Sequence, residues 1–329
     1  MKIDKNQFKL FLKFLRYLLP YRKKQIIVLI LAGGDVLLGL VNPYLSKLVV
    51  DKAILNRNIK LFIILGLAGT AIFIANGLVA ALSSLLKRGI RLKVNFDINK
   101  SVFSHLQRLP LGFFHDKSTG EHMYKINSDI ERTVDLIVSV PEESITIFPT
   151  VLLTLIIIFH LNWQMAIFSI LLTPMLYLPS YYFTRRMHAV WKTLFKNEER
   201  IFTRLGEVFS HMYLIKAAGK EKKEIGNYLK ALIENIRMQI KNTRLEVSNN
   251  FIQGGFNRLI LGVLALFGGL QIIRGRMSMG TLTAIIIYVG QLNGLQGRLA
   301  YFFQRVTYGL ISCKRLEEIL QEKPTAREV

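Results

Sequence analysis

The residue types that most often carry catalysis or metal binding are scarce in this chain. Its single cysteine, Cys313, excludes an intramolecular disulfide and any zinc or iron–sulfur cluster built on cysteines. None of the six histidines has another four residues away, the spacing that would place two ligands on one helix face. No glycine pair at the spacing of a phosphate-binding loop is followed by Lys and Ser or Thr. We therefore expect no metal site and no catalytic site on this chain.

The informative polar residues lie inside long apolar stretches, where a charge must face either protein or water. Asp35 lies in the middle of the first stretch, and Arg258 lies in the inner half of the fifth. Amide side chains accompany them in the last two stretches: Asn249, Asn250, Gln253, Gln291, Asn293 and Gln296. These residues fit a polar cavity that accepts a charged or amphipathic solute. For Asp35 and Arg258, a structural ion pair is nearly as good an interpretation.

Those apolar stretches define the class of protein. The 329 residues are 51% hydrophobic with a mean hydropathy of +0.33. A bilayer core about 30 Å thick needs roughly 20 apolar residues in a helix. Six stretches qualify: 26–48, 61–86, 141–161, 163–183, 247–273 and 277–297. The sequence thus predicts an all-α membrane protein with six transmembrane helices. Because a nucleic-acid binder would not carry such stretches, the net charge of +22 does not indicate nucleic acid.

The positive charge instead indicates how the chain crosses the bilayer, since Lys and Arg are retained on the cytoplasmic side. With the N-terminus inside, 37 of the 44 Lys and Arg fall in inner segments and 5 in outer loops. Both termini are therefore expected in the cytoplasm. The outer connections, 49–60, 160–162 and 274–276, are short, whereas the inner ones are long.

The long inner connections read as continuations of the membrane helices. After residue 86, apolar residues recur at helical spacing with charged residues between them: Ile90, Val94, Ile98, Val102, Leu106 and Leu109. At 1.5 Å per residue, residues 87–109 would extend roughly 35 Å beyond the bilayer. Residues 1–20 form a separate amphipathic segment that ends at Pro20, and we expect it to lie as an elbow helix in the cytoplasmic interface of the lipid bilayer. Near the inner end of the third stretch, Glu142 and Glu143 are expected to reach toward the same interface.

Four local motifs resemble the transmembrane domain of type IV ABC exporters, the family of bacterial multidrug and lipid exporters. HLQRLPLGFFHDKSTGEHMYKINSDIERT (105–133) is similar to the first intracellular loop, and FSHMYLIKAAGKEKKEIGNY (209–228) to the second. RGRMSMGTLTAIIIY (274–288) resembles the outer turn into the sixth span, and KRLEEIL (314–320) the exit toward a nucleotide-binding domain. The four motifs occur in the family's order, and the resemblance extends over nearly the whole chain.

The resemblance implies that residues 21–320 form the six-helix domain and residues 321–329 a linker, with no nucleotide-binding domain in this chain. ATP and Mg²⁺ would then be bound by a partner ATPase domain, and a second transmembrane half would complete a homo- or heterodimer. Two coupling helices would contact the ATPase through their tips: Phe113, Phe114, Thr119, Gly120, Glu121 and Tyr124 in the first, and His211, Met212, Tyr213 and Lys216 in the second.

The sequence also leaves two other functions open. The chain could be a regulatory or structural membrane subunit, or a secondary carrier driven by a gradient rather than by ATP. The sixth span departs from the family pattern because it lacks the usual central proline, so that its flexibility would depend on Gly294 and Gly297.

Overall fold

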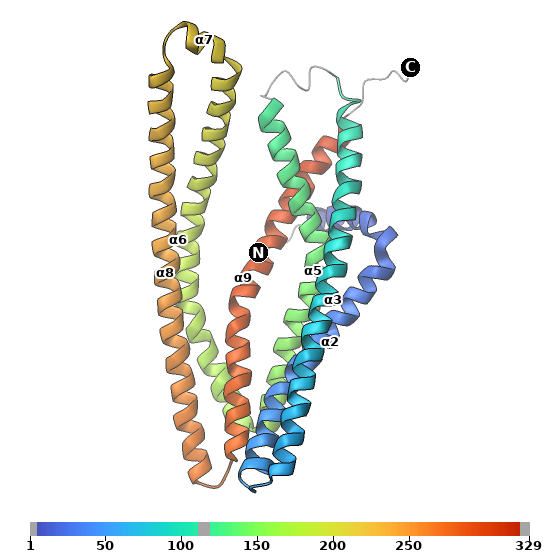
Figure 1. Ribbon diagram of the computed structural model, residues 1–329, viewed down its shortest axis with the longest axis vertical. Helices are drawn as coiled ribbons and strands as arrows, with labels where there is room; N and C mark the ends of the chain where they lie inside the picture. Colours follow the sequence, from blue (N-terminus) through green and yellow to red (C-terminus); the bar gives the residue numbers. More distant parts are fainter. Residues whose placement is uncertain (1–4, 111–118, 323–329) are drawn as a thin grey trace. The chain divides into compact units, whose positions relative to one another are not determined.

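The computed structural model describes residues 5–110 and 119–322, and every regular element in these ranges is a helix (Figure 1). In chain order the helices are α1 (Lys5–Phe14), η1 (Leu15–Tyr21), α2 (Arg22–Leu48), η2 (Val49–Ile54), α3 (Ile59–Leu106), α5 (Thr119–Leu161), α6 (Trp163–Ser210), α7 (Met212–Ala217), α8 (Glu221–Ile273) and α9 (Met279–Gln321). The predicted all-α architecture is confirmed.

Four continuous helical stretches within the described residues are long and apolar enough to cross a membrane. They cover Leu10–Ile54, Ile59–Leu106, Ile126–Leu161 and Glu221–Ile273, and Trp163–Leu172 is a shorter apolar helix. The chain is therefore a multi-pass membrane protein, and the count of six spans stays a prediction.

The helix beginnings follow local capping chemistry. The Asn58 side chain accepts a hydrogen bond from the Leu61 N–H at 3.0 Å and so starts α3. Ser278 does the same for α9 through the Thr281 N–H at 3.1 Å. The first outer connection is shorter than predicted, because the π-helical segment η2 continues α2 as far as Ile54.

The predicted continuation of the second span is confirmed by burial. The apolar stripe of α3 from Ile90 to Leu106 is buried, with Val94 and Ile98 fully enclosed. It packs in one core with Ile130 and Ile137 of α5 and with Leu316 of α9. The stripe buries apolar surface against neighbouring helices over more than four helical turns, which explains why a helix of this length holds together beyond the membrane.

The N-terminal segment divides its apolar surface between protein and solvent. Phe14 and Leu18 are buried in the same core, whereas Leu12 and Leu19 are about half exposed. The Tyr17 hydroxyl and Ser101 Oγ on α3 lie 2.9 Å apart in a hydrogen bond. Phe14 and Leu18 thus fix the elbow to the protein, and Leu12 and Leu19 remain available to lipid.

The helices form two compact units. Within the described residues, the first contains 5–110, 124–169 and 263–322. The second contains 119–123 and 170–262, and so holds most of α6, all of α7 and most of α8. The candidate residues are described below within the unit to which each belongs.

Candidate transport and coupling residues

Polar side chains of α3 and α9 bind the backbone of α2 around Asp35. Asn76 Nδ2 donates to the Asp35 carbonyl at 3.3 Å, and Gln291 Nε2 donates to the Gly39 carbonyl at 3.4 Å. One residue further along α2, the buried Tyr288 hydroxyl donates to the Leu40 carbonyl at 2.6 Å. Gln291, predicted as a cavity residue, is therefore a link between helices in this structure, and Asp35 is half-buried beside it.

The other predicted cavity residues are spread over both units. Asn293 is half-buried on α9, and the side chain of Gln296 lies outside the described part of that helix. In the second unit, Asn250 and Arg258 are exposed on α8, and Gln253 Nε2 donates to Asn249 Oδ1 at 3.0 Å. Because Asp35 and Arg258 belong to different units, their pairing stays a prediction.

A row of carboxylates on α5 is matched by cations on its neighbours. Glu142 lies 2.7 Å from Lys87 Nζ, and Asp135 lies 2.9 Å from an Arg91 guanidinium nitrogen, both on α3. Glu143 pairs with Arg305 of α9. Glu142 and Glu143 are thus engaged by neighbouring helices, and because all three pairs are partly exposed, each contributes at most about 1 kcal/mol.

Sequence reasoning did not single out the α9 arginines. Besides Arg305, Arg298 donates to Thr146 Oγ1 at 3.4 Å. The two arginines lie seven residues apart, directly after the last predicted span, and so project from one side of α9. The seven-residue spacing of these arginines, together with the adjacent Glu142 and Glu143, was the sequence feature from which a charged contact between α9 and α5 could have been predicted.

Farther along α9 lies a buried polar cluster. Ser312 Oγ donates to Asp129 Oδ1 at 2.7 Å, and the Cys313 thiol contacts Thr133 Oγ1 at 3.7 Å. Burial raises the pKa of Cys313 to about 12. The thiol therefore stays protonated at neutral pH and is a poor nucleophile.

The second predicted tip is the short helix α7, which joins α6 to α8 (Figure 1). Tyr213 is 87% exposed, His211 and Lys216 are exposed, and Met212 is partly covered. Gly219 has a φ of +59°, the left-handed conformation that favours glycine and lets the chain turn from α7 into α8. An aromatic ring exposed to this degree is typical of a surface that a partner covers.

In the first tip, Phe113 and Phe114 lie outside the described residues. Thr119, Gly120, Glu121 and Tyr124 occupy the first two turns of α5. Their predicted contact with an ATPase stays a prediction.

The chain is thus an all-α membrane protein. It has several helices long enough to cross a membrane, long helical extensions and a short helix at the end of one hairpin. Residues 25–296 match the ABC transporter transmembrane region, so the chain belongs to this family.

The relatives of this chain are longer than the chain itself. It is 24% identical to the uncharacterized ABC transporter ATP-binding protein YknV of Bacillus subtilis, over 96% of this chain and 53% of that protein. It is 23% identical to the ATP-dependent lipid A-core flippase of Desulfotalea psychrophila, over 85% of this chain and 49% of that protein. It is 22% identical to the mouse ABC-type oligopeptide transporter ABCB9, over 94% of this chain and 41% of that protein. The chain thus spans about half the length of the curated relatives it matches.

Proposed function

We propose that this chain is the membrane-spanning, substrate-translocating part of an ATP-driven exporter. It moves an amphipathic solute, such as a lipid, a peptide or a drug, outward by alternating access. The observation that carries the proposal is the family match over residues 25–296, since members with this region are named as a flippase and as an oligopeptide transporter.

ATP and Mg²⁺ are bound by a nucleotide-binding domain, supplied either by further sequence in a longer protein or by a separate chain. The names of the ATP-binding relatives and the share of them that this chain spans support this partner. A second transmembrane half, identical or related, completes the transport path.

The two hairpin tips carry the coupling. Rigid helices that extend from the membrane convert a shift of the ATPase domain into movement of the spans. The uninterrupted course of α6 and α8 and the exposure of Tyr213 on α7 support this role for the second tip. The positive charge of the hairpins supports a topology with both tips and both termini in the cytoplasm.

The transport path draws on the polar residues of the spans, with Asp35, Arg258 and the amides of α8 and α9 as candidates. Charged and amide groups beside apolar walls suit a solute that has a polar head and an apolar body. The exposed Asn250 and Arg258 are the better candidates, because Gln291 is engaged with α2.

ATP-dependent uptake into inside-out membrane vesicles tests the function. Vesicles from cells with the intact gene and from cells with the gene deleted are offered fluorescent lipids, peptides and dyes. Uptake should require the gene and ATP, and should persist when an uncoupler removes the proton gradient. Uptake that follows the gradient and ignores ATP identifies a secondary carrier, and the absence of gene-dependent uptake for all solutes favours a regulatory subunit.

A further inference from the structure

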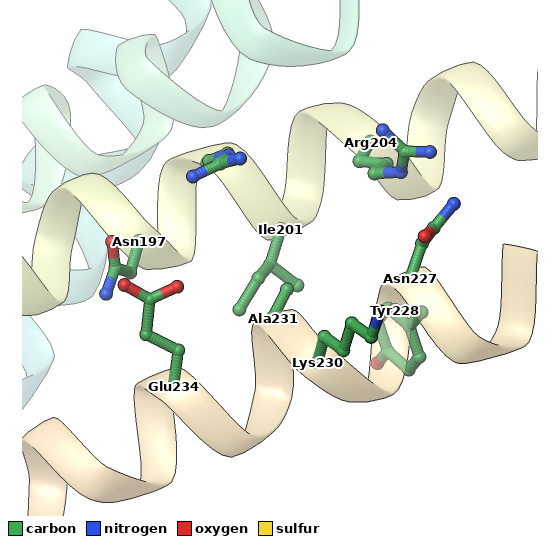
Figure 2. Close-up of a pocket in the computed structure, with 9 residues that line it drawn as sticks. Asn197, Ile201, Arg204, Asn227, Tyr228, Lys230, Ala231 and Glu234 are labelled. Atoms are coloured by element: carbon green, nitrogen blue, oxygen red, sulfur yellow. The ribbon is translucent and has the colours of Figure 1, made fainter.

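A polar groove lies between α6 and α8 in the second unit, apart from the residues considered above (Figure 2). Its volume is about 290 Å³. Its polar walls come from both helices: Asn197, Arg200 and Arg204 on α6, and Asn227, Lys230 and Glu234 on α8. A space of this size accommodates a small organic molecule.

At one end of the groove, the positive charge of Arg204 is already paired with a carboxylate. Arg204 Nη2 lies 2.9 Å from Glu224 Oε2, and Asn227 Nδ2 donates to the other oxygen of Glu224 at 3.3 Å. These three side chains tie α6 to α8 and form a fixed wall. They leave little attraction for a further charge at this end.

The remaining cations are unmatched. Arg200 and Lys230 form no ion pair with any residue in the described part of the chain. They also lie on a strongly basic hairpin, because residues 185–244 contain 14 Lys and Arg against 6 Glu. Guanidinium and ammonium groups on opposite walls of one groove attract a compact anion, and the guanidinium fork fits phosphate oxygens well.

The other end of the groove offers an unused donor and an acceptor. Asn197 Nδ2 is buried, and no described residue accepts a hydrogen bond from it. Glu234 faces Asn197 from the opposite helix (Figure 2). A buried donor without an acceptor costs free energy. A hydroxyl group satisfies both side chains at once, since it accepts from the amide and donates to the carboxylate.

We propose that this groove binds a small phosphorylated hydroxy compound, such as a sugar phosphate, with its phosphate between Arg200 and Lys230 and a hydroxyl group between Asn197 and Glu234. Ile201 and Ala231 line the groove between these two points, and the carbon skeleton packs against them (Figure 2). The site is separate from the transport path, and its ligand need not be the transported solute.

The same chemistry occurs in a free sugar phosphate and in a phosphorylated inositol lipid. Arg200 lies about 25 Å along α6 beyond Phe183, the end of the uncharged stretch, at 1.5 Å per residue. A headgroup in the bilayer interface does not reach that far. The soluble compound is therefore the expected source.

Calorimetric titration of the purified full chain in detergent with glucose 6-phosphate tests the proposal. Saturable binding is expected, and it should be at least about tenfold tighter than binding of inorganic phosphate or of glucose alone, because only the phosphorylated sugar engages both ends of the groove. Arg200→Gln with Lys230→Gln should weaken it by about tenfold or more. Glu234→Gln should reduce the preference for glucose 6-phosphate over inorganic phosphate.

The matched control is Arg237→Gln with Lys241→Gln, which removes two exposed charges from α8 outside the groove. It should change the affinity less than twofold. The proposal is overturned if wild-type protein shows no saturable binding, or if the control weakens binding as much as the groove variant. Binding only to vesicles that contain phosphatidylinositol 4-phosphate, and not to glucose 6-phosphate, contradicts the soluble source.

Discussion

At the scale of single residues, one carboxylate joins two distant parts of the chain. Asp51 Oδ1 accepts from the Gly280 N–H at 2.8 Å, and Asp51 Oδ2 accepts from Ser278 Oγ at 2.6 Å. The contact is so close that a Cβ on residue 280 would lie 2.5 Å from the Lys47 carbonyl oxygen. Glycine is therefore required at position 280 for the beginning of α9 to reach η2.

Gly280→Ala should lower the melting temperature of the purified chain, with a cost of about 1–3 kcal/mol from forced separation of the two helices. Gly33→Ala is the matched control, since a Cβ there meets nothing within 4 Å and alanine favours a helix. Equal melting temperatures for wild type and Gly280→Ala would show that the contact contributes nothing.

The two interpretations of Arg258 differ in their effect on stability. If Arg258 pairs with Asp35, Asp35→Asn should cost about 3–5 kcal/mol, and Asp35→Asn with Arg258→Gln should recover much of that loss. If Arg258 faces the transport path, Arg258→Gln should weaken solute binding and leave the melting temperature nearly unchanged. We expect the second result, because Arg258 is exposed within its unit. Melting curves of both single variants and the double variant distinguish the two.

Sequence reasoning found polar residues within spans but not their partners. Asp51 and Gly280 are 229 residues apart, so that no local pattern relates them. Arg305 was counted as part of the inner positive charge, which indicates topology and not the pairing with Glu143. Contacts of this kind depend on how helices pack, and a single sequence does not record that packing.

At the scale of elements, the stripe of α3 could be predicted because helical periodicity is local. The same reasoning predicted residues 1–20 as an amphipathic elbow, but it did not identify Phe14, which is 2% exposed and fixes the elbow to the core. Some apolar residues of the elbow pack against protein and others are available to lipid. Periodicity alone does not distinguish the two groups.

Phe14→Ala should therefore destabilise the chain by about 3–5 kcal/mol, the usual cost of removing a buried aromatic ring. Leu12→Ala should change the melting temperature little in detergent, because Leu12 is 48% exposed. Thermal unfolding of both variants, followed by circular dichroism, checks the difference. A larger effect of Leu12→Ala would mean that the elbow packs through its other edge.

At the scale of the whole molecule, the topology can be tested by labelling. A cysteine at Asn56 should react with a membrane-impermeant maleimide added to intact cells, and a cysteine at the exposed Lys222 should react only after the cells are opened. Native Cys313 should not react at neutral pH in either case, because the thiolate is the reactive form and burial raises the pKa of this thiol to about 12. The reverse pattern at residues 56 and 222 would overturn the orientation.

If the tips of this chain couple transport to an ATPase, the number of solute molecules moved per ATP hydrolysed must depend on them. The measurement uses the exporter reconstituted with its ATPase domain in liposomes. Phe114→Glu and Tyr213→Glu should leave membrane insertion intact and reduce this ratio about tenfold or more, whereas Tyr213→Phe should keep it near the wild-type value. An unchanged ratio in both glutamate variants would rule out coupling through these two tips.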